Sequence, residues 1–179
     1  MLSEQEVVDI FREHLPEDVN IHVIPIDTYI PISLQHPYIQ LQMRLGVYDE
    51  ENIWRDFLSP ARSYVTLKKM EVCYDLLTNV AIGVDDEDLI RSYIILMAIH
   101  EGHHFHANHA PVDMEEHAEA EAACVRETAN MYPDLSDKVA QFETQSLAHQ
   151  RVYERMRSQI AFLQGESHDR TNSPAVHGS

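Results

Sequence analysis

Five consecutive residues, His100-Glu101-Gly102-His103-His104, match the pattern H-E-x-x-H. On a helix, residues four apart lie one turn apart on one face, so His100 and His104 can offer imidazole nitrogens to one ion. Zn²⁺ accepts such ligands at about 2.0–2.1 Å and lowers the pKa of a bound water to about 7. Glu101, beside the first ligand, can accept the proton of that water as it attacks a carbonyl. The pattern therefore predicts a metal site with its own general base.

Three further histidines follow the same stretch at steps of three: His103, His106 and His109. They could line a flank of the helix without binding an ion, and we expect them to do so. A rival ligand set would use His103 with His106 or His109, but it leaves Glu101 without a role. Between Ala81 and Glu121 there are ten acidic residues and one basic residue. This negative field favours a bound cation.

A catalytic zinc usually has a third protein ligand and one open position. The next helix offers five candidates: Glu115, Glu116, His117, Glu119 and Glu121. A chain reversal around Ala110–Val112 makes the two helices antiparallel neighbours, and the midpoint of the histidine pair then lies level with position 120. Glu119 and Glu121 are nearest to this level. They lie about 200° apart around the helix axis, so only one of them can face the ion.

Two residues near the C-terminus are weaker catalytic candidates. His149 and Tyr153 lie one turn apart on an apolar seam. Either side chain could donate a hydrogen bond to the oxyanion of a tetrahedral intermediate. A buried, hydrogen-bonded core histidine and a core tyrosine explain the same pattern, and we prefer that interpretation.

The first part of the chain predicts a helix and a small sheet. A capping box opens a helix over Ser3–Leu15. Alternating apolar residues predict strands over Val19–Val23, Tyr38–Tyr48 and Arg62–Leu67.

The second part predicts three helices. The first begins at Asp85 or Asp86 and runs to about Asn108, and the second runs from Asp113 towards Asn130. The third spans about Ser136–Leu163. We expect an α+β fold in one domain over residues 1–164, with residues 165–179 as a disordered tail.

Composition excludes several classes of function. Lys and Arg number 13 against 30 Asp and Glu, a formal net charge of −17. Such a chain is poorly suited to bind nucleic acid or an anionic membrane surface. The N-terminus does not have the pattern of a signal peptide, and the apolar runs are too short to span a bilayer. Cys73 and Cys124 show no sign of a disulfide, so we expect a cytoplasmic protein.

The HEGHH stretch followed by EAEAACV at residues 119–125 resembles the gluzincin pattern. Within that class the chain is most similar, over about residues 1–130, to the small ImmA/IrrE-type, minigluzincin-like metallopeptidases. The resemblance implies an N-terminal helix, a short sheet, a helix with H-E-x-x-H and a helix bearing a glutamate in an E-x-x-A context. It implies Zn²⁺ as cofactor and favours Glu119, which starts the E-x-x-A pattern, as the third ligand. Glu115 is the next choice, because it lies one turn away from Glu119 on the same face of the helix.

The resemblance also implies a substrate. In that family an edge strand binds the substrate peptide by β-augmentation, and Arg62–Leu67 or Tyr38–Tyr48 could serve here. Members characteristically cleave DNA-binding repressors, and an acidic protein would attract such a basic partner.

We therefore expect a zinc-dependent peptidase that hydrolyses a polypeptide. The alternative is a non-catalytic, metal-stabilised acidic interaction protein, in which the same residues hold two helices together. A di-metal carboxylate protein ranks last, because it needs two E-x-x-H pairs and only Glu101–His104 is placed to face a core.

Overall fold

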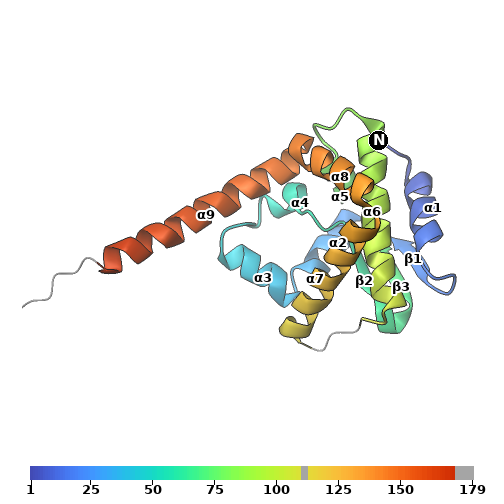
Figure 1. The fold of residues 1–179 in the computed structure, drawn as a ribbon, viewed down its shortest axis with the longest axis horizontal. Coiled ribbons are helices and arrows are strands. Elements are labelled where there is room, and N and C mark those ends of the chain that lie inside the picture. Colours follow the sequence, from blue (N-terminus) through green and yellow to red (C-terminus); the bar gives the residue numbers. More distant parts are fainter. Residues whose placement is uncertain (110–112, 172–179) are drawn as a thin grey trace, which may run out of the picture.

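The computed structural model describes residues 1–109 and 113–171, and its fold is α+β, as predicted (Figure 1). The first elements in chain order are α1 (Glu4–His14), β1 (Asn20–Val23), α2 (Ile26–Ser33), α3 (Pro37–Arg44), α4 (Ile53–Asp56), β2 (Ala61–Tyr64), the 3-10 helix η1 (Val65–Leu67) and β3 (Lys69–Val72). They are followed by α5 (Tyr74–Val80), α6 (Glu87–His106), α7 (Met114–Met131), α8 (Pro133–Gln145) and α9 (Leu147–Thr171). Within the described residues, none of the helices is both long enough and apolar enough to cross a bilayer.

The sheet has the strand order β1-β3-β2, with β1 parallel and β2 antiparallel to β3. Successive side chains of β2 point to opposite faces. The Arg62 guanidinium pairs with Glu71 and lies over the Tyr29 ring of α2. Ser63 instead contacts α6 on the other face. Among the described strands, the outer edge of β2 has no partner, so this edge is free beside α6.

Helix α6 occupies the centre of the fold and packs against α1, α7, α8 and β2 (Figure 1). Leu89, Ile94 and Ala98 of α6 belong to the main apolar core. Near the other end of the helix, a Cβ atom on Gly102 would collide with the His14 carbonyl oxygen. The glycine in HEGHH thus permits the close approach of α1, which fixes the position of the histidine-bearing turn.

The helix N-termini that the sequence predicts from capping residues are confirmed. Ser3 and Glu6 form the predicted capping box of α1, and the predicted strand over Val19–Val23 is β1. The side chains of Asp86 and Asp113 cap α6 and α7. The chain reversal predicted at 110–112 lies outside the described residues.

The strand predicted over Tyr38–Tyr48 is wrong, because this segment contains helix α3. His36 caps the helix with its ring, and Pro37 occupies the first turn, where the missing N–H costs nothing. The apolar residues of this segment recur every two positions, so they also recur every four. Of them, Ile39 is buried in the structure, whereas Leu41 and Leu45 are exposed. The alternation therefore did not mark one face of a sheet.

The single helix predicted over Ser136–Leu163 is also wrong, because it is broken at Ser146 into α8 and α9. The Ser146 hydroxyl donates to the Val80 carbonyl and accepts from the His149 backbone N–H. Ser146 has an extended backbone, and its side chain satisfies groups that the helix leaves open. The predicted tail at 165–179 overlaps the end of α9, while residues 172–179 lie outside the described residues.

A buried carboxylate attaches α9 to the rest of the fold. Asp56, at the end of α4, is fully buried and bonds with Arg55, Arg151 and Arg155. Arg151 and Arg155 lie one turn apart on α9. Burial opposes ionisation of Asp56, but the bonds from the arginines outweigh it and lower its pKa to about 2. The charged Asp56 thus connects two helices that are distant in sequence.

Candidate metal centre

The structure brings His100 and His104 of α6 together with Glu121 of α7. The His100 Nε2 atom lies 3.1 Å from Glu121 Oε2 and 3.2 Å from His104 Nε2. The His104 Nε2 atom lies 3.2 Å from Glu121 Oε1. The two imidazole nitrogens thus lie side by side and each faces a different oxygen of the Glu121 carboxylate, so the three side chains form a ligand triangle.

The triangle fits a tetrahedral zinc ion. Bonds of about 2.0–2.1 Å in tetrahedral geometry require ligand atoms to lie about 3.3–3.4 Å apart. The observed separations of 3.1 and 3.2 Å are close to that value. The side chain of Glu121 is 41% exposed, so solvent reaches the triangle from the side of α7. Three protein ligands with access to solvent are typical of a catalytic site rather than a closed structural one.

The charges at the triangle complement one another. Burial opposes ionisation of Glu121, but hydrogen bonds from His100 and His104 outweigh it and hold its pKa well below the ordinary value. Burial likewise disfavours the charged form of His100, yet the Glu121 carboxylate raises the pKa of His100 overall. A permanent negative charge thus faces the histidine pair, as a cation site requires.

The structure places Glu121, and not the expected Glu119, beside the histidine pair. Glu119 is exposed and does not belong to the group of close ligand atoms, which contains Glu121 instead. Glu115, the next choice, is exposed near the start of α7. The expected antiparallel pairing of the two helices placed position 120 opposite the histidine pair, within one residue of Glu121. It could not predict which face of α7 turns towards α6, because that depends on packing.

Glu101 lies in the turn between the two histidines and is held by the sheet. The Ser63 hydroxyl of β2 donates a hydrogen bond to Glu101 Oε2. This bond occupies one carboxylate oxygen and leaves Oε1 to accept a proton. The contact joins the free edge strand to the residue predicted as the general base. Sequence analysis did not identify Ser63, because 38 residues separate the two partners.

His149 and Tyr153 form a separate cluster at the start of α9. The His149 ring lies against Tyr93 and Phe142, and its Nδ1 is 2.9 Å from the Ser146 hydroxyl. The Tyr153 hydroxyl donates to Glu143 at 3.1 Å. Tyr93 precedes the histidine pair by two turns of α6, about 10 Å along the helix. His149 is buried, as expected of a core histidine. Tyr153 is hydrogen-bonded but 40% exposed, so it is not the core tyrosine that we expected.

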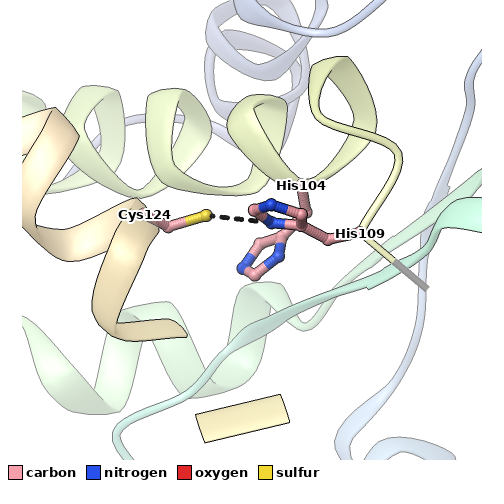
Figure 2. Close-up of side chains that lie close together, drawn as sticks. All are labelled: His104, His109 and Cys124. Carbon is pink, nitrogen blue, oxygen red and sulfur yellow. Dashed lines mark hydrogen bonds between the residues drawn. The ribbon is translucent and has the colours of Figure 1, made fainter. Parts of the chain in front are cut away.

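The three other histidines at the end of α6 and just after it behave differently from one another. The His103 ring lies 3.4 Å from a carboxylate oxygen of Glu127, and His106 is exposed, so both line a flank as predicted. His109 instead turns back towards α7. Its Nδ1 lies 3.6 Å from the sulfur of Cys124, and its ring packs against His104 (Figure 2).

Cys124 is a residue that the sequence did not mark as functional. Both cysteines are free, and Cys124 is 1% exposed. Burial, with added repulsion from nearby carboxylates, raises the pKa of the Cys124 thiol to about 12. The thiol therefore keeps its proton at neutral pH without a metal. A thiol that keeps its proton is a poor nucleophile.

No family model, curated protein or solved structure matched this chain when it was compared with each of the three.

In a Cys124→Ser background, where the neighbouring thiol cannot act as a substitute ligand, replacement of Glu121 by alanine should weaken zinc binding by more than about 100-fold, since loss of a hydrogen-bond partner of a ligand already costs about 10–100-fold. Glu119→Ala is the matched control, because it removes the same side chain from an exposed position two residues away. Zinc affinity is measured by competition with a chromogenic chelator. Weakened binding in the Glu119 variant, with full affinity in the Glu121 variant, would restore the choice of Glu119.

The buried His149 should make the fold sensitive to acid. Burial lowers the pKa of His149 to about 4, against about 6.5 in an unfolded chain. The unfolded state therefore binds the proton first, and stability is lost as the pH falls from about 6.5 to about 4. Between about pH 7 and about pH 5, the free energy of unfolding should drop by about 2 kcal/mol from this group. Urea denaturation at each pH measures the free energy of unfolding, and His149→Phe should remove this part of its pH dependence. An unchanged pH dependence in this variant would refute the prediction.

Proposed function

We propose that this protein is a zinc-dependent peptidase that hydrolyses a polypeptide. The observation that carries the proposal is the triangle of His100, His104 and Glu121, with Glu101 beside it and bonded to Ser63. The spacing between the two imidazole nitrogens and the carboxylate oxygens that they face supports Zn²⁺, and the exposure of Glu121 supports access for a substrate. The resemblance to gluzincins of the ImmA/IrrE type points the same way, with Glu121 in place of Glu119.

Zinc held by this triangle would supply the Lewis acid that polarises a carbonyl and a water molecule. Glu101 acts as the general base through Oε1, taking the proton of the attacking water and passing it to the leaving amine. Ser63 fixes the carboxylate by its bond to Oε2, so the base keeps one orientation through the reaction. His100, His104 and Glu121 hold their positions because α6 and α7 pack against each other.

The substrate class follows from the free edge of β2. An extended peptide can add to such an edge by main-chain hydrogen bonds, as in β-augmentation. Because Ser63 of β2 bonds Glu101, a peptide on this edge would pass beside the general base. Of the two segments predicted for this role, Tyr38–Tyr48 contains helix α3. Arg62–Leu67 is a strand only as far as Tyr64, within β2, and its last three residues form η1. The net charge of −17 favours a basic polypeptide.

The free state of Cys73 and Cys124 supports a reducing compartment, and we propose the cytoplasm.

Hydrolysis of quenched fluorescent peptides by the zinc-loaded protein tests the proposal. The peptides should form an extended series that differs in net charge, so that a preference for basic segments can be read directly. We expect cleavage that a chelator abolishes and added zinc restores. Cleavage that survives the chelator would contradict a metal-dependent peptidase.

A further inference from the structure

A second group of metal-ligating side chains adjoins the first and shares one residue with it. The ligand atoms of His104, His109 and Cys124 all lie within 4.8 Å of one another. Figure 2 shows Cys124 reaching from α7 towards the two imidazole rings, which come from α6 and the turn after it. Cys124 and His104 are buried and His109 is half-buried. A thiol among imidazoles in a buried position is a combination that zinc and other thiophilic ions bind.

The distance between the ligand atoms of Cys124 and His109 fits a shared metal ion. A zinc ion with a sulfur at about 2.3 Å and a nitrogen at about 2.0–2.1 Å places these atoms about 3.6 Å apart in tetrahedral geometry. The Cys124 sulfur and the His109 Nδ1 atom are 3.6 Å apart. The His104 ring lies beside them, with its centroid 5.5 Å from that of His109. Two of the three donors therefore already have the separation that a shared ion demands, and the third is adjacent.

The shared residue sets a rule for occupancy. A neutral imidazole offers one lone pair, because its other ring nitrogen carries a proton. His104 can give that lone pair to the ion at His100 and Glu121 or to the ion at His109 and Cys124, but not to both. When His104 turns to the second group, His100 and Glu121 still have each other, across a contact of 3.1 Å.

We propose that His104, His109 and Cys124 form a second metal seat with a thiolate ligand, and that the two seats exclude each other through His104. Binding at the second seat replaces the S–H bond of Cys124 by a metal–sulfur bond and releases the proton to solvent. The softer the ion, the more the thiolate favours the second seat over the carboxylate of the first. The proposal that this seat binds a metal depends only on the geometry of its ligands. The consequence that an ion bound there inhibits hydrolysis rests on the proposed function.

Titration of the metal-free full chain with Co²⁺ tests the seat, because a cobalt–thiolate bond gives a charge-transfer absorption that nitrogen and oxygen ligands do not. The wild type should show this band and bind one Co²⁺ per chain at saturation. Cys124→Ser should abolish the band, whereas Cys73→Ser, which changes the other buried free cysteine, should keep it. His109→Ala, at a half-buried position, should abolish it while Cys124 stays in place. Circular dichroism verifies that each variant is folded.

A second part of the titration tests whether the two seats exclude each other. Glu121→Gln damages only the first seat, so the band should appear at lower Co²⁺ concentration than in the wild type. The second seat is overturned if the band is absent from both the wild type and Glu121→Gln, or if it persists in folded Cys124→Ser. Saturation at two Co²⁺ per chain would overturn the exclusion. Because the readout is absorption, failure of the peptidase assay leaves this result intact.

Discussion

Glu101→Gln should lower peptide hydrolysis by about 10²–10⁴-fold, the contribution that a positioned general base makes. Glutamine keeps the size of the side chain and can still accept the hydrogen bond from Ser63, but its amide cannot take a proton from the attacking water. The substitution does not change any side chain of the ligand triangle, so zinc content and melting temperature should stay close to the wild-type values. Steady-state cleavage of a peptide substrate and elemental analysis of the same preparations measure both effects.

Glu119→Gln is the matched control, since it makes the same chemical change at an exposed carboxylate outside the triangle. It should cleave at the wild-type rate. Near wild-type hydrolysis by Glu101→Gln would show that Glu101 is not the base. If the wild type binds zinc at the triangle yet cleaves none of the peptides, the non-catalytic, metal-stabilised interaction protein becomes the better account.

Asp56→Ala should reduce the free energy of unfolding by about 3 kcal/mol, near the lower end of the range for breaking a buried ion pair. Asp56 is fully buried and accepts bonds from Arg55, Arg151 and Arg155. Its removal leaves guanidinium groups without their shared partner where α4 meets α9. Arg55 and Arg151 are partly exposed and can be hydrated, which keeps the loss from being larger. Urea denaturation measures it, and Trp54, the one tryptophan, lies two residues from Asp56 on α4.

Asp18→Ala is the control for a surface ion pair. Asp18 lies 3.5 Å from the Lys68 ammonium group, and both side chains are more than half exposed. Such pairs contribute about 0–1 kcal/mol, so this variant should unfold at nearly the wild-type urea concentration. A loss below about 1 kcal/mol in Asp56→Ala would mean that α9 is held by its apolar contacts rather than by the carboxylate.

Helices with strong end signals could be predicted from the sequence. Asp86 and Asp113 cap α6 and α7, and each side chain acts within its own first turn. Such local chemistry does not depend on the rest of the chain. For the same reason, the placement of His100 and His104 on one helical face followed directly from their spacing.

Features decided by packing could not be predicted. The spacing of the apolar residues over Tyr38–Tyr48 is compatible with a strand or a helix. The helix forms here because His36 caps its N-terminus. The face of α7 that carries Glu121 depends on how α7 rotates against α6. The bonds of Ser63 to Glu101 and of Asp56 to Arg155 join residues 38 and 99 positions apart. Pairings at such distances leave no periodic trace in a single sequence.

The most direct test of the central claim is the position of zinc in crystals of Cys124→Ser, grown with excess zinc and measured at the zinc absorption edge. This variant removes the second seat, so the triangle is the one remaining group of three close ligand side chains among the described residues. We predict an anomalous-difference peak at bonding distance from a nitrogen of His100, a nitrogen of His104 and a carboxylate oxygen of Glu121. An ordered triangle without such a peak, with zinc in excess, would contradict the account.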